Sequence, residues 1–122
     1  HEEIDLALDN LSRQDFQNDE RFAFALARSR QSAGYGPQRI RAELYQHSLE
    51  SESIYQAISA LNCDWLELAQ DLVARRYLRK IKQDPNQVRK AVDFLLRRGF
   101  DQKTAYTAVK IREWPETLQF ID

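Results

Sequence analysis

The chain has 122 residues, of which 43% are hydrophobic and 30% are charged, with only three glycines and three prolines. That length corresponds to about one domain, and the scarcity of turn-forming residues excludes a disordered chain and an all-β fold. The single cysteine, Cys63, excludes an intramolecular disulfide and fits a reducing compartment. The longest apolar runs are far shorter than the ~20 residues of a membrane span, so we expect a cytoplasmic protein without a membrane segment.

Charge is distributed unevenly along the chain, although the formal net charge is only −1. Residues 1–20 carry seven acidic side chains and one arginine, whereas residues 75–112 carry twelve lysines and arginines against three aspartates. An acidic beginning and a basic second half favour a partner with a charged surface, either nucleic acid or an acidic protein. The alternative is that these charges only solvate the outer faces of helices.

The segment NDERFAFALARSRQSAG, residues 18–34, has the apolar spacing of a helix, with Phe22 and Leu26 on one side. Gly34 follows this helix and Pro37 stands at the first position of the next, which is the usual order at a helix boundary. A nucleotide-binding loop would follow a strand and show G-x-G-x-x-G or G-x-x-x-x-G-K-[ST], and neither pattern occurs. The stretch between the two helices is therefore interpreted as an architectural corner.

Two further helices are predicted in the second half of the chain. Asp64 stands at an N-cap position with Glu67 three residues later, and an apolar stripe follows from Trp65. The segment NQVRKAVDFLLRRGF repeats that spacing and ends at Gly99, the usual residue of a left-handed C-terminal turn. No segment alternates at period two for long enough to compete as a strand. We therefore predict an all-α fold.

The short segments IDLALDNL, IYQAISAL and AYTAVKIR superpose at offsets of 50 and 51 residues, which indicates an internal repeat. The matched positions upstream are Ala23 with Ala69, Arg30 with Arg76, Leu44 with Leu95 and Ser48 with Gly99, and the extra residues KIKQDPN are predicted as a loop. We expect tandem three-helix repeats stacked into an elongated, curved, right-handed array of the solenoid type. The expected divisions are residues 1–17 as the last helix of a truncated first repeat and a linker, residues 18–62 and 63–113 as the second and third repeats, and residues 114–122 as a C-terminal tail.

Residues 18–44, NDERFAFALARSRQSAGYGPQRIRAEL, are close to a D-[DE]-x-R-[FY]-A helix, a G-[YP]-x-[RK]-I corner and an x-x-E-L continuation. The segments CDWLELAQDLVARRY and FLLRRGF match a Trp-led helix and an [RK]-G-[FY] turn. In this combination of motifs the chain resembles the RecX family of regulatory proteins over nearly its whole length. It departs from the family pattern at Ser48, where a glycine is usual, and in lacking two helices of the first repeat.

The resemblance implies a non-enzymatic inhibitor. RecX proteins look like curved stacks of three-helix repeats that lie in the groove of the RecA filament on DNA. There they bridge RecA subunits and hinder ATP hydrolysis, strand exchange or coprotease activity. The resemblance thus implies that the partner of this chain is the RecA filament, in recombinational DNA repair and the SOS response. Direct contact with single- or double-stranded DNA stays open, and we expect the chain to act as a monomer.

Two other functions stay open. One is an autonomous DNA-binding helical repeat protein, since short helices joined by tight corners are similar to helix-turn-helix units. Such a protein would bind DNA without RecA and with strong salt dependence. The other is an α-helical protein-interaction adaptor. No nucleophile–base pattern, metal-ligand spacing or cofactor motif is found, so no catalytic residue, metal or cofactor is predicted.

The candidate contacts to a partner are basic side chains, because Arg and Lys on rigid helices suit acidic protein surfaces and phosphates alike. They flank the corner at Gly34, follow the Trp65 helix and lie off the apolar stripe of the next helix. Phe94 stands among them, and packing against a neighbouring helix is favoured for it over stacking on a base. The predicted contact residues are Arg28, Arg30, Arg39, Arg41, Arg75, Arg76, Arg79, Lys80, Lys82, Arg89, Lys90, Arg97 and Arg98.

Overall fold

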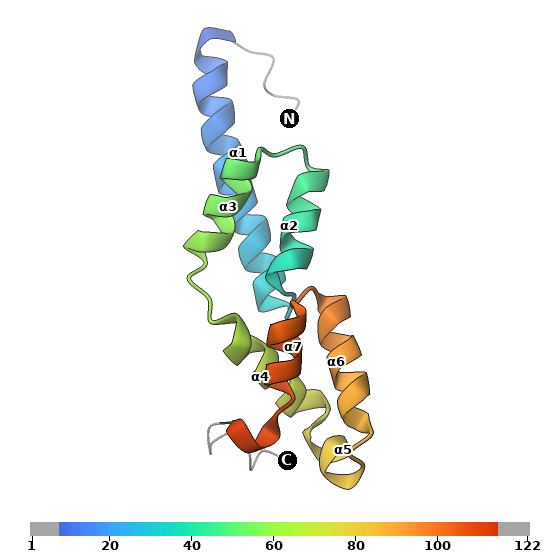
Figure 1. Cartoon of the computed structure of the whole chain (residues 1–122). Helices are drawn as coiled ribbons and strands as arrows, with labels where there is room; N and C mark the ends of the chain where they lie inside the picture. Colours follow the sequence, from blue (N-terminus) through green and yellow to red (C-terminus); the bar gives the residue numbers. More distant parts are fainter. Residues whose placement is uncertain (1–7, 115–122) are drawn as a thin grey trace.

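The computed structural model describes the backbone of residues 8–114 (Figure 1). Side chains are described from residue 18 onwards. All regular structure within residues 8–114 is helical. The helices are α1 (Leu8–Ser32), α2 (Pro37–Gln46), α3 (Ser51–Ala60), α4 (Trp65–Arg76), α5 (Leu78–Gln83), α6 (Gln87–Arg98), α7 (Gln102–Ala108) and the short 3₁₀ helix η2 (Ile111–Glu113). The prediction of an all-α protein is confirmed.

The helices form two bundles stacked along one long axis (Figure 1). Helices α1, α2 and α3 make the N-terminal unit, whose core includes the fully buried side chains of Ile40, Leu44 and Ile54. Helices α4 to α7 make the C-terminal unit, whose core includes Leu78 and Phe100. Removing these apolar side chains from water stabilises each bundle around its own centre. The predicted architecture of stacked, tandem helical units is confirmed.

The helix boundaries follow the local signals in the sequence. Gly34 lies after α1 with a φ of 90°, and Pro37 is the first residue of α2. The carboxylate of Asp64 accepts a hydrogen bond from the backbone N–H of Glu67 and so caps α4. Gly99 ends α6 with a φ of 101°, a conformation that glycine adopts without a steric penalty.

The turn after α2 repeats the turn after α6. Leu44 and Leu95, which lie four positions before Ser48 and Gly99 respectively, are both fully buried. Ser48 has a φ of 62°, in the same left-handed region as Gly99 at 101°. The N-terminal unit therefore keeps the left-handed turn even though its residue there carries a Cβ.

Replacing Ser48 with glycine is expected to raise the free energy of unfolding by about 0.5–1 kcal/mol. The left-handed conformation costs a residue with a Cβ about 1–2 kcal/mol, and the greater freedom of glycine in the unfolded chain offsets part of the gain. Chemical denaturation measures the change. Ala42→Gly, at an exposed position inside α2, is the matched control and is expected to lower stability by about 1 kcal/mol. A Ser48→Gly protein no more stable than the parent would contradict the strain at this turn.

Helix α1 is continuous where the sequence predicts a linker. It runs without a break from Leu8 to Ser32, and so passes through the division expected at residue 17. No glycine or proline occurs before Gly34, so nothing in the backbone interrupts the helix there. The first copy of the repeat, residues 4–11, lies mostly outside the described residues.

The prediction of a loop at KIKQDPN is wrong for the first part of that segment. Helix α5 covers it as far as Gln83 and buries Leu78 and Ile81 in the core of the C-terminal unit. Two apolar side chains three positions apart fit one face of a helical turn. Pro85 then prevents the helix from continuing.

Trp114 belongs to the C-terminal unit rather than to a tail. Its side chain is only 3% exposed, and its indole Nε1 donates a hydrogen bond to the carbonyl oxygen of Ala108 at 2.8 Å. A large aromatic ring with a satisfied N–H is a stabilising part of a core. The rest of the predicted tail, residues 115–122, lies outside the described residues.

Candidate functional site

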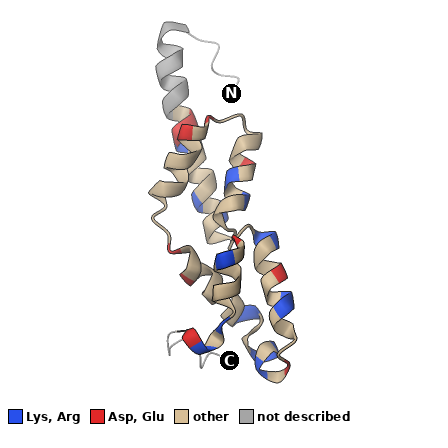
Figure 2. Cartoon of the chain, viewed as in Figure 1, with Lys and Arg blue, Asp and Glu red and all other residues tan. Residues whose placement is uncertain are grey.

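The thirteen predicted contact residues lie on five helices, α1, α2, α4, α5 and α6. Eleven of them are exposed, and only Arg30 and Arg98 are half-buried. Figure 2 shows lysines and arginines following one another along α2 and α6. The contacts divide these side chains into three groups: those at the junction of the two units, those paired within one unit, and those without a partner.

The junction is built from two glycine-containing corners that lie against each other. The backbone N–H of Gly36 donates to the carbonyl oxygen of Arg98 at 2.7 Å, and the N–H of Gln38 donates to that of Gly99 at 3.0 Å. A Cβ added to Gly36 would lie 2.6 Å from the carbonyl carbon of Gly99. Glycine therefore permits the two backbones to touch, and α2 begins where α6 ends.

Arginines and aromatic rings alternate across this junction. The guanidinium carbon of Arg39 lies 4.5 Å from the centre of the Tyr35 ring, and that of Arg98 lies 4.6 Å from the same ring. Arg98 also lies 5.1 Å from the centre of the Phe94 ring, and Arg76 lies 4.9 Å from it. We call Arg39, Tyr35, Arg98, Phe94 and Arg76 the junction row.

The junction row presents guanidinium groups rather than free aromatic faces. Phe94 is only 6% exposed, so it packs between helices, as favoured from the sequence, and cannot stack on a base. Each guanidinium in contact with a ring is held by a cation–π attraction, while its N–H groups along the edge can still bind a carboxylate or phosphate. The row therefore has the chemistry that binding an anion requires.

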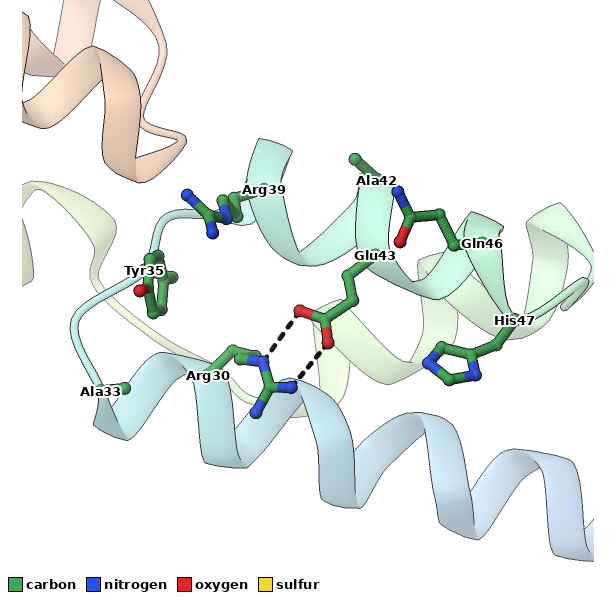
Figure 3. Close-up of a pocket in the computed structure, with 8 residues that line it drawn as sticks. All are labelled: Arg30, Ala33, Tyr35, Arg39, Ala42, Glu43, Gln46 and His47. Atoms are coloured by element: carbon green, nitrogen blue, oxygen red, sulfur yellow. Dashed lines mark hydrogen bonds and ion pairs between the residues drawn. The ribbon is translucent and has the colours of Figure 1, made fainter.

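Arg30 and Glu43 form an ion pair between α1 and α2. Arg30 Nε donates to Glu43 Oε1 at 2.8 Å, and its Nη2 donates to Oε2 at 2.6 Å. Figure 3 shows this pair on the wall of a hollow of about 550 Å³ that Tyr35, Arg39 and His47 also line. A bidentate pair of this kind is both strong and specific in geometry, so Arg30 serves the fold more directly than a partner.

The C-terminal unit has a different contact at the positions that match Arg30 and Glu43. Arg76 matches Arg30 in the repeat, and Phe94, immediately before Leu95, matches Glu43. The N-terminal unit joins its two helices by an ion pair, whereas the C-terminal unit joins them by a guanidinium over a ring. Arg76 therefore also has a structural partner while its side chain stays exposed.

The ion pair between Arg30 and Glu43 makes the free energy of unfolding depend on pH. The hydrogen bonds from Arg30 lower the pKa of the Glu43 carboxyl below its ordinary value of 4.5. A carboxyl group whose pKa is lowered by folding adds to the free energy of unfolding at pH values above its ordinary pKa. This contribution is lost as the pH falls through the pKa of the folded state. Glu43→Gln is thus expected to be less stable than the parent at pH 7, with a difference that shrinks below about pH 4.5.

Denaturant titrations of both proteins from pH 7 to pH 2.5 measure that difference. Asp101, whose pKa is lowered by its hydrogen bond from the backbone of Thr104, is present in both proteins and cancels. A stability difference that stays constant over the whole range would show that Glu43 makes no ionic contribution.

The remaining cations are partly paired and partly unpaired. Arg75 Nε lies 3.0 Å from Asp71 Oδ2 one turn earlier in α4, and Lys80 Nζ lies 5.4 Å from the centre of the Tyr77 ring. Lys82 is exposed on α5. Within residues 18–114, six of the predicted contact residues make no side-chain hydrogen bond, ion pair or ring contact. These are Arg28, Arg41, Arg79, Arg89, Lys90 and Arg97.

The described residues also bear on three other features: a reactive thiol, a metal site and a membrane span. Burial raises the pKa of the Cys63 thiol, which disfavours the reactive thiolate. No group of three His, Cys, Asp or Glu side chains in this part of the chain could hold a metal ion. None of its helices is long and apolar enough to cross a membrane.

Comparison with known families decides what the two units are. The sequence model of the RecX second three-helix domain matches residues 18–58, and that of the RecX third three-helix domain matches residues 63–109. The chain belongs to the RecX family. The two matches lie in the N-terminal and C-terminal units, and the corners that join these units lie inside them.

Curated RecX proteins of several bacteria support the assignment. The chain is 45% identical over 104 residues to the regulatory protein RecX of Xanthomonas axonopodis pv. citri. The aligned segment covers 85% of this chain and 64% of that protein. The chain is also 45% identical over the same length to RecX of Xanthomonas oryzae pv. oryzae, covering 65% of that protein. RecX of Stenotrophomonas maltophilia is 48% identical over 95 residues, covering 78% of this chain and 58% of the relative. The chain thus spans somewhat less than two thirds of the relatives it matches.

Tyr35 is a residue of the junction that the sequence alone does not identify. It lies between the two glycines of the corner and has basic residues on both sides in the sequence. An aromatic residue in such a setting is a signal for guanidinium stacking. The partner that makes it important, Arg98, is 63 positions away, and only the fold brings the two together.

Proposed function

We propose that this chain is a non-enzymatic regulator that binds the RecA nucleoprotein filament and inhibits its ATPase, strand-exchange and coprotease activities. It would act in the cytoplasm, as a monomer, in recombinational DNA repair and the SOS response. Residues 18–62 and 63–113 would be its second and third repeats. The observation that carries the proposal is the match of both units to RecX three-helix domains.

The charged surface supports a filament as the partner. Six exposed arginines and lysines on α1, α2, α5 and α6 have no partner within the described part of the chain. Bringing unpaired cations to an acidic surface speeds association and aligns the partners. Units that repeat along one axis (Figure 1) offer similar surfaces at a regular spacing, which suits a partner built from repeating subunits.

Co-sedimentation with RecA filaments assembled on single-stranded DNA tests the proposal. The chain is expected to sediment with filaments and, at the same salt concentration, much less with the DNA alone. Equal binding to bare DNA that weakens steeply with salt would instead favour the autonomous DNA-binding protein. Binding to neither would favour an adaptor unrelated to recombination.

A further inference from the structure

We infer that Arg98 is a positioning residue that fixes the angle between the two units, so that the partner-binding surfaces of α2 and α6 are held in one relative orientation. The consequence for inhibition rests on the proposed function. The structural part, the restraint that Arg98 places on the joint, does not.

Arg98 makes three contacts that cross from the C-terminal to the N-terminal unit. Its Nη1 donates to the carbonyl oxygen of Ala33 at 2.8 Å, and its guanidinium lies over the Tyr35 ring at 4.6 Å. Its own carbonyl oxygen accepts the N–H of Gly36 at 2.7 Å. On its own unit, the guanidinium lies over Phe94. One side chain is therefore fixed on both sides of the junction.

Arg39 completes the joint from the other unit. It lies over the same Tyr35 ring, and its Nη1 donates to the carbonyl oxygen of Arg97 at 3.4 Å. Each unit thus sends one arginine to the end of the other. A planar guanidinium suits this role, because it can stack on a ring and donate hydrogen bonds from its edge at the same time.

Apolar packing across the joint is limited. The two cores are separate clusters, and among residues 18–114 only Trp65 packs against both. Interfaces between units of one chain usually allow relative motion unless they are large and hydrophobic. The polar contacts of Arg98 therefore carry much of the restraint on the angle.

A fixed angle matters for a partner with more than one binding position. Arg39 and Arg41 lie on α2, and Arg89, Lys90 and Arg97 lie on α6. If the units moved freely, binding would have to order them first and affinity would fall. Arg98 thus affects binding through the placement of other side chains rather than only through its own charge.

Distance measurements on the whole chain test the inference directly. Spin labels are placed by Tyr55→Cys on α3 and Tyr106→Cys on α7, two exposed positions in different units, in a Cys63→Ser background. Double electron–electron resonance is expected to give one narrow distance for the parent and a clearly broader distribution for Arg98→Ala. Arg97→Ala is the matched control, because the neighbouring side chain is exposed and unpaired, and its distribution is expected to stay narrow.

Binding to the RecA filament supplies the second readout. Arg98→Ala is expected to weaken it about tenfold with little change in the midpoint of thermal unfolding, since neither core is altered. Arg98→Lys, which keeps the charge but not the planar stacking group, is expected to give a broadened distribution and weakened binding as well. If Arg98→Lys kept both the narrow distance distribution and the parental filament binding, charge alone would matter, and the inference would be overturned.

The two proposals fail in different ways. An unchanged, narrow distance distribution in Arg98→Ala overturns the inference about the joint, whatever the filament binding shows. A broadened distribution in Arg98→Ala supports the inference about the joint. If the parent protein then does not bind RecA filaments, the proposed function alone is overturned.

Discussion

Replacing Gly36 with alanine is expected to lower the free energy of unfolding by about 2–3 kcal/mol and to open the junction between the units. The added Cβ would lie 2.6 Å from both the carbonyl carbon and the oxygen of Gly99 and 2.7 Å from the backbone N of Phe100. These are backbone atoms, so relief requires the two corners to move apart, and overpacking of this kind is strongly destabilising. Chemical denaturation measures the loss.

Backbone amide exchange locates the damage in Gly36→Ala. The N–H groups of Ala at this position and of Gln38 are expected to exchange faster, because their hydrogen bonds to Arg98 and Gly99 are broken. Gln38→Ala is the control, since it removes an exposed side chain and keeps the same backbone bond. A Gly36→Ala protein with parental stability and protected amides would show that the corners are not in close contact.

The double substitution Arg89→Glu with Arg97→Glu is expected to weaken binding to RecA filaments by about tenfold or more. Both side chains are exposed on α6 and unpaired within the described part of the chain. Reversing their charge replaces attraction to an acidic surface with repulsion, which costs up to several kcal/mol in a complex and slows association. Binding is measured as a function of salt, because the effect of exposed charges is screened at high ionic strength.

A charge-matched variant separates surface contact from net charge. Lys103→Glu with Lys110→Glu changes the net charge by the same amount at exposed positions on or next to α7, outside the predicted contact residues. Its binding is expected to stay within about threefold of the parent. Equal weakening by both double variants would mean that net charge, not the α6 surface, determines binding.

The local structure could be predicted because its causes are local. Gly34 before Pro37, Asp64 before Trp65 and Gly99 after the last turn of a helix each act through the backbone of a few neighbouring residues. The repeat was predictable for the same reason, since Leu44 and Leu95 occupy the buried face of matching helices. Even the unusual Ser48 keeps the left-handed turn that the repeat requires.

The junction could not be predicted, because its contacts join residues far apart in the sequence. Charge and position in the sequence do not distinguish Arg97, whose side chain is unpaired within the described residues, from Arg98, which contacts Ala33 and Tyr35 across the units. The roles of Arg30 and Arg76 likewise depend on which side chain the opposite helix offers. The sequence therefore identifies the basic residues, and the fold separates those that hold it together from those open to a partner.

The most direct test of the proposed function is the rate of ATP hydrolysis by RecA on single-stranded DNA, measured while this chain is added at fixed salt. Inhibition is expected at concentrations too low for the chain to coat the DNA. The Arg89→Glu, Arg97→Glu variant is expected to need at least several-fold more protein for the same effect. Undiminished hydrolysis at concentrations where the chain binds DNA by itself would contradict a filament-directed regulator.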